Sequence, residues 1–307
     1  MPAIVQNETQ AGLVYMSVKQ VADYLHLNEK KIYALVSEDR IPATKITGKW
    51  MFPRELIDKW MRDSSHGGLL TDRLIIAGSD DPLLYRIVNE YAADTGPYAL
   101  ISYSPTATRP GLNLLESRRI DVCAIHWGPA SESHIRHPAL LQQHAEARNW
   151  VLIHAFKREQ GLLIRPDSAL KKQSVKDIFN SPLRWSLRQS GSGAQRFLME
   201  YLSKYHLNTD DLNCVATTLS EREAAASITM GTADIAPGVR ASATEYGLDF
   251  IPFGWESFDL VIPRTIWFRR LFQALIKQLK SPACQHQADL LTGYDLSRTG
   301  ELVWGDE

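Results

Sequence analysis

The first hydrophobic pattern along the chain has the period of a helix. Residues 18–25 place apolar side chains three or four positions apart, and residues 32–36 repeat the pattern after a short polar turn. Ser17 and Asn28 stand before these two runs, and both residue types cap helix amino termini. The pattern predicts two short helices joined by a tight turn.

The next segment, "IPATKITGKWMF", predicts two short strands that reverse at Thr47-Gly48, because glycine tolerates the positive φ of a hairpin turn. Pro53 suits the first turn of a third helix that extends to about Arg62. The stretch "DSSHGGLLT" is rich in Ser and Gly, and it predicts a linker over residues 64–71. Residues 1–13 are polar and without pattern, which is typical of a flexible tail. A first domain over residues 14–63 follows.

The hydrophobic pattern changes from Asp72 onward. Short apolar runs such as "RLIIAGS", "DVCAIHW" and "GLLIR" alternate with helical stretches such as "PLLYRIVNEYAADT". This alternation predicts a second, α/β domain over residues 72–307 with a largely parallel sheet.

Composition and charge narrow the class of protein. The chain has 307 residues, 34 basic and 35 acidic side chains, so a net charge of −1 gives no global attraction to nucleic acid. Three distant cysteines lack the paired spacing of a zinc site. No secretory signal and no run of about 18 apolar residues is visible, so we expect a cytoplasmic protein.

Local charge distinguishes the first domain. Between Met16 and Asp63, six Lys and three Arg stand against four Asp and three Glu, a net charge of +2. A helix, a turn, a helix and a hairpin are the parts of a winged helix-turn-helix, whose second helix enters the major groove. Lysines there would neutralise phosphates, and amide or phenol groups would approach base edges. The candidate DNA-binding residues are Asn28, Lys30, Lys31, Tyr33, Lys45, Thr47 and Lys49. The alternative is that these side chains only solvate a small helical domain.

The segment "MSVKQVADYLHLNEKKIYALVSEDRIPATKITGKWMFPRELIDKWM" resembles the excisionase and MerR-type helix-turn-helix domains. The shared features are a hydroxyl residue before the first helix, "IP" before the wing, and "W-x-F" before a last helix that ends in Trp. The resemblance implies DNA binding, and it implies that Trp50, Phe52 and Trp60 pack in the core.

A glycine and serine loop, "RQSGSGAQRF", precedes a helical pattern in the second domain. It lacks the third glycine of a dinucleotide fingerprint and the Gly-Lys-Ser/Thr ending of a P-loop. A helix amino terminus still suits an anion, because its N–H groups are free and the helix dipole is positive there. The alternative is that Ser192 only caps the helix.

Four segments, "EQGLLIRPDS", "RQSGSGAQRFL", "MGTADIAPGVRASA" and "LDFIPFGWESFDLVIP", resemble the type II periplasmic binding protein fold, in the branch that is fused to DNA-binding domains and related to molybdate- and tungstate-binding proteins. The resemblance implies two lobes, one of about residues 72–155 and 255–307, the other of about 156–254, with a ligand between them. The chain would cross near residues 154–158 and return near 251–256. The implied ligand-binding residues are Ser79, Asp80, Ser104, Thr106, Ser190, Gly191, Ser192, Gly193 and Ala194.

Two features weaken the case for an oxyanion such as molybdate. Relatives commonly have Thr where Ala194 stands, so a hydroxyl is lost, which leaves room for a larger organic anion. Asp80 and Asp81 also oppose an anion unless they point outward or cap a helix. Arg109, Arg188 and Arg196 are the candidates to compensate, although each is more often a surface charge.

Catalytic motifs are absent from the sequence. It holds nine histidines but no His-Glu-x-x-His, no Gly-x-Ser-x-Gly and no paired Cys motif. His126 follows an apolar strand and is a candidate for the edge of the cleft, and Cys123 inside that strand is expected to be buried. We expect no enzyme activity, no metal and no cofactor beyond an effector ligand.

The sequence thus predicts an α/β protein with an amino-terminal winged helix-turn-helix, acting as a one-component transcriptional regulator that senses a small anion, with molybdate or tungstate as the leading candidates. We expect a homodimer, because one small reader makes few base contacts. The amphipathic stretch "TIWFRRLFQALIKQL" supplies either the dimer surface or, as the simpler interpretation, packing against lobe one. The alternatives are the same architecture with a small organic ligand, and an excisionase-like DNA-architectural protein whose second domain senses nothing.

Overall fold

The computed structural model describes residues 15–38, 40–46, 48–64 and 73–305. The predicted tail at 1–13, residues 65–71 of the predicted linker and Thr47 lie outside these residues. The chain divides into two compact units, Met1–Thr71 and Asp72–Glu307, and each is described by itself. No helix among the described residues is both long and apolar enough to cross a lipid bilayer.

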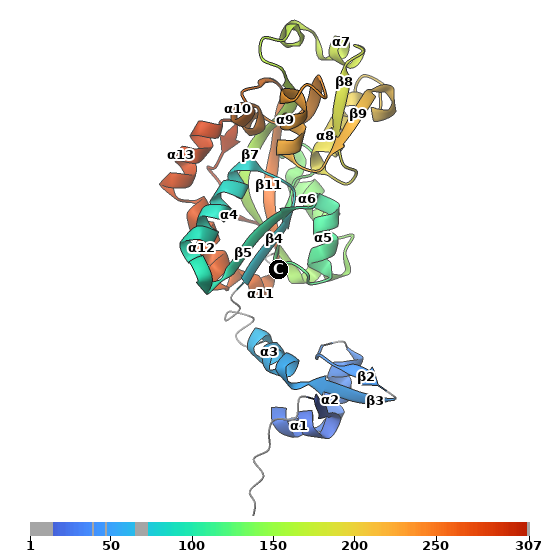
Figure 1. Cartoon of the computed structure of the whole chain (residues 1–307), viewed down its shortest axis with the longest axis vertical. Coiled ribbons are helices and arrows are strands. Elements are labelled where there is room, and N and C mark those ends of the chain that lie inside the picture. Colours follow the sequence, from blue (N-terminus) through green and yellow to red (C-terminus); the bar gives the residue numbers. More distant parts are fainter. Residues whose placement is uncertain (1–14, 39, 47, 65–72, 306–307) are drawn as a thin grey trace, which may run out of the picture. The chain divides into compact units, whose positions relative to one another are not determined.

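The small unit contains the three predicted helices and the predicted hairpin (Figure 1). The helices are α1 (Val18–Leu25), α2 (Glu29–Ser37) and α3 (Arg54–Ser64), and the strands are β1 (Tyr15–Ser17), β2 (Thr44–Ile46) and β3 (Lys49–Pro53). The strands form an antiparallel sheet in the order β1-β3-β2, in which β1 is an addition to the predicted pair. Gly48 has φ +83°, the conformation that the predicted turn requires.

Helix caps and one aromatic cluster define this unit. Ser17 and Gln20 form a capping box at the start of α1, and the side chain of Asn28 accepts a hydrogen bond from the Lys31 N–H at the start of α2. Phe52 is fully buried in the core of the unit, and Trp50 and Trp60 pack against that core. The prediction that these aromatic residues serve packing is confirmed.

The large unit is built on one mixed sheet of ten strands, with the path β5-β4-β6-β11-β7-β10-β8-β9 and two further strands, β12 and β13, paired to β7. The strands are β4 (Arg73–Gly78), β5 (Leu100–Pro105), β6 (Val122–Ile125), β7 (Trp150–Ile164), β8 (Arg184–Arg188), β9 (Asn213–Thr218), β10 (Ile235–Val239), β11 (Asp249–Pro263), β12 (Tyr294–Asp295) and β13 (Leu302–Trp304). The helices are α4 (Pro82–Thr95), α5 (Thr108–Glu116), α6 (Ser133–Leu141), α7 (Val175–Phe179), α8 (Gly193–Ser203), α9 (Glu221–Thr229), α10 (Arg240–Tyr246), α11 (Arg264–Trp267), α12 (Arg270–Leu279) and α13 (Pro282–Leu291).

Two strands of 15 residues, β7 and β11, connect the two lobes of this unit. They pair antiparallel along almost their whole length, from Trp150 opposite Pro263 to Ile164 opposite Asp249. At one end β11 pairs with β6, and at the other end β7 pairs with β10. The expectation of a largely parallel sheet holds only inside each lobe, where β4 is parallel to β5 and β6, and β8 is parallel to β9 and β10. The connecting strands run antiparallel because the chain crosses between the lobes and returns.

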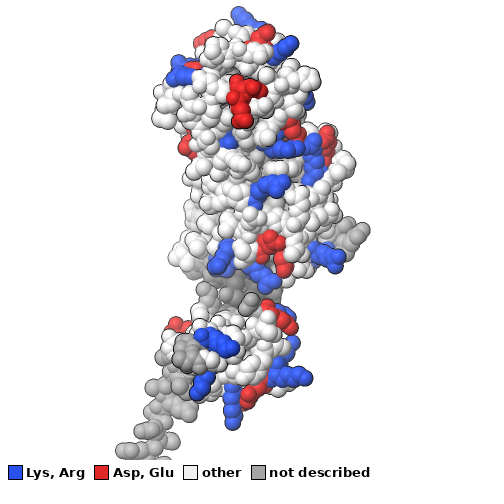
Figure 2. All heavy atoms as spheres, turned by 90° about the vertical axis from the view of Figure 1, so that its right-hand side faces the viewer, with Lys and Arg blue, Asp and Glu red and all other residues white. Residues whose placement is uncertain are grey.

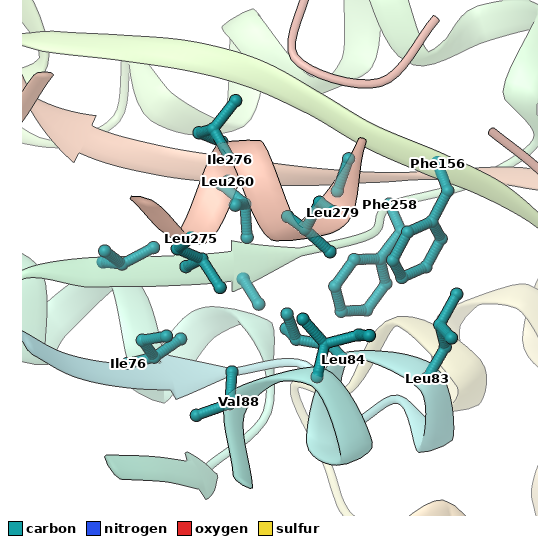
Figure 3. Packing of buried hydrophobic residues seen from close by; sticks show 14 of the residues in the cluster. Ile76, Leu83, Leu84, Val88, Phe156, Phe258, Leu260, Leu275, Ile276 and Leu279 are labelled. Atoms are coloured by element: carbon teal, nitrogen blue, oxygen red, sulfur yellow. The ribbon is translucent and has the colours of Figure 1, made fainter. Parts of the chain in front are cut away.

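Lobe one has apolar cores on both faces of its sheet. On one face α4, α12 and α13 pack on the strands, and on the other α5 and α6 do so (Figure 1). Figure 3 shows the first core, in which Phe156 of β7 and Phe258 of β11 lie against leucines of α4 and α12. The two rings are stacked at 5.0 Å. The amphipathic face of α12 is buried in this core through Phe272, Leu275, Ile276 and Leu279, so the packing interpretation of that stretch is confirmed.

The last described strands attach to the connecting strand β7. Tyr294 of β12 pairs opposite Arg158, and Leu302 of β13 pairs opposite Ile153. The Thr299 hydroxyl donates a hydrogen bond to the backbone oxygen of Ala155. The carboxy-terminal segment thus covers the edge of β7 that β11 leaves open in lobe one.

We expect Phe258→Ala to lower the free energy of unfolding of the large unit by about 3–5 kcal/mol, because Phe258 is fully buried and its removal leaves a cavity. Phe268→Ala is the matched control, since Phe268 is 71% exposed and its loss is expected to cost no more than about 0.5 kcal/mol. Urea unfolding of the full chain, monitored by hydrogen exchange in β7 and β11, measures the change in the free energy of unfolding for both substitutions. Equal effects of the two substitutions would contradict this assignment of the core.

Candidate functional site

The candidate DNA-binding residues that the structure describes lie on two surface elements, the start of α2 and the wing formed by β2 and β3. Asn28, Lys30, Lys31 and Tyr33 are exposed at the start of α2, and Lys45 and Lys49 are exposed on the two strands of the wing. Lys45 lies 5.5 Å from the centre of the Trp50 ring. The side-chain oxygen of Asn28 is engaged as the helix cap, which leaves its amide group for any base contact. Basic side chains are prominent on the small unit in Figure 2.

In lobe one the predicted ligand loops lie at the carboxyl ends of β4 and β5. A Cβ at Gly78 would lie 2.2 Å from the backbone oxygen of Ala124 on the neighbouring strand β6, so only glycine fits at this position. The Ser79 hydroxyl lies 2.7 Å from that of Thr108 in the first turn of α5. The backbone N–H of Thr106 donates to the oxygen of Gly78, so the two loops are held together.

In lobe two the predicted loop forms the amino terminus of α8. The Ser192 side chain accepts a hydrogen bond from the Gln195 N–H and so caps α8. Gly193 packs directly on His126 of lobe one, because a Cβ at Gly193 would lie 2.2 Å from two ring atoms of His126 and 2.3 Å from its backbone oxygen. The two lobes are therefore closed on each other at this point.

Hydrogen bonds of the cleft loops also join the lobes. The Arg109 N–H donates to the backbone oxygen of Gly191 at 3.3 Å. The Glu221 N–H, in the first turn of α9, donates to the Asp80 carboxylate at 2.6 Å. Asp80 from lobe one thus occupies the amino terminus of a lobe-two helix, which is the kind of position where anions bind. The neighbouring Asp81 caps α4 by accepting from the Leu84 N–H, one of the two placements that relieves its opposition to an anion.

Arg158, in the middle of β7, is the centre of the buried polar groups between the lobes. Its guanidinium donates to Glu256 at 2.7 Å, to the Asp81 carboxylate at 3.0 Å and to the backbone oxygen of Asp80 at 2.6 Å. A fourth contact at 3.2 Å joins it to Nδ1 of His126. Although burial lowers the pKa of Arg158, the carboxylates around it raise the pKa, so this side chain is charged.

The neighbours of Arg158 respond to the same burial. Burial and the two nearby arginines hold the pKa of His126 well below its usual value, so the imidazole is neutral and Nδ1 accepts from Arg158. Burial raises the pKa of Glu256 to about 7, against the opposing effect of Arg158. Burial likewise raises the pKa of Asp81. For each of these neighbours of Arg158, burial thus favours the neutral form more than water would.

A second buried ion pair lies in lobe two. Arg188, at the end of β8, is 2.9 Å from the Glu221 carboxylate, and both side chains are almost fully buried. Burial raises the pKa of Glu221 and the Arg188 charge opposes that change. The buried cluster therefore contains two guanidinium groups against four carboxyl groups, which belong to Asp80, Asp81, Glu221 and Glu256.

Several buried polar atoms near this cluster have no hydrogen-bond partner among the described residues. They include the Thr106 hydroxyl in lobe one, the Ser186 hydroxyl in lobe two, and both amide atoms of Gln160 on the connecting strand. A buried polar group needs a hydrogen-bond partner, so these atoms are available to bond to water or to a ligand. No three His, Cys, Asp or Glu side chains in the described ranges are arranged to hold a metal ion.

The structure thus brings together part of the predicted ligand set. Ser79, Asp80 and Thr106 of lobe one lie on the loops that meet Gly191 and Gly193, whereas Ser104 and Ser190 are exposed. Ser192 and Ala194 are buried within the start of α8.

The residues that sequence reasoning missed are Arg158, Glu256 and Glu221. Glu256 carried a signal, since it is a charged residue inside a largely apolar strand pattern, whereas Arg158 stands between Lys157 and Glu159 and nothing local singles it out; the two pair opposite each other in the sheet. Of the three arginines considered as compensating charges, Arg188 is buried. Arg109 lies over the Trp127 ring and Arg196 pairs with Glu200, and both are exposed.

Two family models match the chain. Residues 89–280 match the model described as a PBP superfamily domain, and residues 15–65 match a helix-turn-helix domain. A Bacillus subtilis (strain 168) protein named YvgK, described as uncharacterized, is 26% identical over 97% of this chain and 99% of its own length.

Solved structures share the fold at low sequence identity. An H2O2-bound cysteine-to-serine mutant of OxyR from Corynebacterium glutamicum has a TM-score of 0.53 and 12% identity, with 90% of each chain covered. A structure described as a phosphate ABC transporter substrate-binding protein with bound phosphate, from Clostridium perfringens, has a TM-score of 0.50 and 11% identity, and covers 71% of this chain and 97% of its own.

We expect Gly193→Ala to prevent the lobes from closing as they do here, because the new methyl group meets the backbone of His126, which cannot move aside as a side-chain end would. The N–H groups of Arg109 and Glu221 should then exchange with solvent at least tenfold faster, since their bonds across the lobes open. Ser190→Ala in the same loop adds no atoms and serves as the control. Unchanged exchange in Gly193→Ala would show that the contact with His126 does not hold the lobes.

Proposed function

The chain belongs to the PBP superfamily, and we propose that it is a DNA-binding regulator whose large unit binds a small anion between its two lobes. The carrying observation is the joint occurrence, in one chain, of a helix-turn-helix domain and a two-lobed binding domain. The amino termini of α8 and α9 and two buried guanidinium groups meet at the boundary between the lobes. Helix amino termini and guanidinium groups suit an anion, and the pairing of a helix-turn-helix domain with a binding-protein domain leads us to propose a sensor and not an enzyme.

The proposed anion position is the one that two carboxylates of the chain itself occupy. Asp80 accepts a hydrogen bond from the amino terminus of α9, and Glu221 pairs with Arg188. A carboxylate held by a helix terminus or by a guanidinium marks where an anionic ligand would find the same donors. The ligand would displace one of these internal carboxylates, and the unpartnered Thr106 hydroxyl would gain a bond. We therefore propose Ser79, Asp80, Thr106 and the loop 190–194 as the ligand-binding region.

Molybdate and tungstate are the first candidates, because the segments that resemble molybdate- and tungstate-binding proteins supply the loops of this cleft. The charge balance favours a second candidate, a small organic carboxylate. Two guanidinium groups face four carboxyl groups, so a dianion adds more repulsion than a monoanion does. The methyl group of Ala194 in place of a hydroxyl agrees with this second candidate.

Signalling requires that the ligand bind the closed and open lobes with different affinity, since a ligand with equal affinity for both shifts neither. We propose that the regulator acts as a homodimer in the cytoplasm, with α2 in the major groove and the wing along the backbone. Asn28, Lys30, Lys31, Tyr33, Lys45, Thr47 and Lys49 are the proposed DNA contacts.

We expect one of the anions molybdate, tungstate, sulfate, phosphate, acetate or citrate to raise the unfolding midpoint of the full chain. A ligand at 100 times its Kd adds about 2.7 kcal/mol, which for a unit of this size is roughly 5–10 °C. Thr106→Val should weaken that ligand about 5–10-fold and leave the ligand-free midpoint unchanged, because the hydroxyl has no partner to lose.

Ser104→Ala is the matched control, since Ser104 is exposed on the preceding strand. Calorimetric titration gives the Kd values. DNA binding without a response to any of these anions would support the DNA-architectural alternative over the sensor.

We expect Lys31→Glu to weaken binding to a random-sequence duplex roughly tenfold and to lower the slope of log K against log salt by about 1 for each protomer bound, because each protomer loses one phosphate contact. Lys277→Glu makes the same charge change on an exposed residue of α12 in the other unit, and it should leave DNA binding unchanged. Fluorescence anisotropy across a salt series measures both. An unaltered affinity in Lys31→Glu would remove α2 from the interface.

A further inference from the structure

A cavity of about 650 Å³ lies outside the proposed anion cleft. Lobe one lines it with residues 129–132, which include the short helix η3 (Ala130–Glu132), and with Arg136 of α6. Lobe two lines it with α8, and the bend of β11 at residues 253–255 closes it. None of the nine predicted ligand residues lines this cavity. Its size is that of sites that hold small organic molecules.

One side of the cavity is aromatic. Tyr201 and Phe253 stack face to face with ring centres 3.8 Å apart, and Phe197 continues the stack at 6.4 Å from Tyr201. Trp255 is 42% exposed on the same lining. A register shift in β11 between Pro252 and Gly254 lies next to this tryptophan. Flat aromatic surfaces of this kind select planar, apolar ligands.

The other side of the cavity is cationic. Nη1 of Arg136 and Nε of Arg196 both donate to the same oxygen of Glu200, each at 2.6 Å. Two guanidinium groups from different lobes thus converge on one carboxylate at the cavity wall. Lys204 lies 4.4 Å from the centre of the Tyr201 ring. The lining holds three cations, Arg136, Arg196 and Lys204, against two carboxylates, Glu132 and Glu200, an excess of one positive charge.

Figure 2 views the side of the large unit that carries α6 and α8, and basic side chains gather there at the level between these helices. The Arg136–Glu200 ion pair joins α6 of lobe one to α8 of lobe two. A ligand carboxylate next to this pair would find guanidinium donors already oriented for a carboxylate oxygen.

We propose that this cavity is a second binding site, which takes a planar aromatic monocarboxylate. The ring lies against Trp255 and the Tyr201–Phe253 stack, and the carboxylate is held by Arg196 and Arg136. The charge of a monoanion balances the excess positive charge of the lining. Both lobes line the site, so its affinity depends on the position of one lobe relative to the other. The proposal of this site does not depend on the proposed anion cleft or on DNA binding.

The test uses the full chain and three probes of similar size. These are 2-naphthoate, its uncharged analogue 2-naphthamide, and cyclohexanecarboxylate, which has the charge without the planar ring. Calorimetric titration and tryptophan fluorescence report binding. We expect 2-naphthoate to bind at least fivefold more tightly than either analogue, because both halves of the site are then used.

Two variants locate the site. Arg196→Gln and Trp255→Leu change exposed residues and should each weaken 2-naphthoate at least fivefold. Thermal unfolding verifies that both remain folded, and Arg196→Gln tests the proposal even if Trp255→Leu does not fold. Phe268→Leu, at an exposed aromatic outside the cavity, and Arg109→Gln, at the anion cleft, should leave binding unchanged.

Four results would overturn the proposal. They are no binding of 2-naphthoate, equal binding of 2-naphthamide, binding unaffected by both cavity variants, and loss of binding in Arg109→Gln. The last result would assign the aromatic acid to the anion cleft. If the cleft binds no inorganic anion, the proposal of the second site is unaffected. The two proposals can therefore fail independently.

Discussion

The burial of Arg158 is the constraint on which the arrangement of the large unit depends. A guanidinium group without water is stable only where several acceptors surround it. Here those acceptors come from Glu256 on the partner strand, from Asp80 and Asp81 at the end of β4, and from His126 after β6. One side chain thus contacts the partner connecting strand, the first cleft loop and the residue that caps α4. Removing any acceptor leaves a buried N–H group of Arg158 without a hydrogen-bond partner.

This network also contributes contacts that hold the two lobes together. The cleft supplies its own carboxylates to the positions at which an external anion would bind, one at the start of α9 and one on Arg188. Each internal carboxylate competes with a free ligand for the same donors. Because it is part of the chain, it acts as if present at a high effective concentration, which the free ligand has to exceed. Under the proposed function, the affinity of the cleft would be set by the difference between a ligand and Asp80 or Glu221, and weak anions would not displace these carboxylates.

The sequence was sufficient for the elements but not for their pairing. Caps at Ser17 and Asn28, the turn at Gly48 and the helix after Ser192 were predictable because each depends on neighbours in the chain. The domain types followed from the two resemblances. The contact of Glu256 with Arg158 was not predictable, since it depends on a strand register that joins residues 98 apart. Nor was the closed state, in which Asp80 acts as a ligand for α9, because local sequence does not say which carboxylate a helix terminus will meet.

The attachment of the carboxy-terminal strands to β7 bears on the order of events during synthesis. The Tyr294 hydroxyl donates to Asp81, and it belongs to a segment that emerges from the ribosome more than 200 residues after its partner. Until then Asp81 and the Arg158 cluster lack this contact, and one edge of β7 is open. A nascent chain can fold its helix-turn-helix domain long before this point, since that unit draws only on early residues. During translation the helix-turn-helix unit is therefore complete while the large unit still lacks β12 and β13.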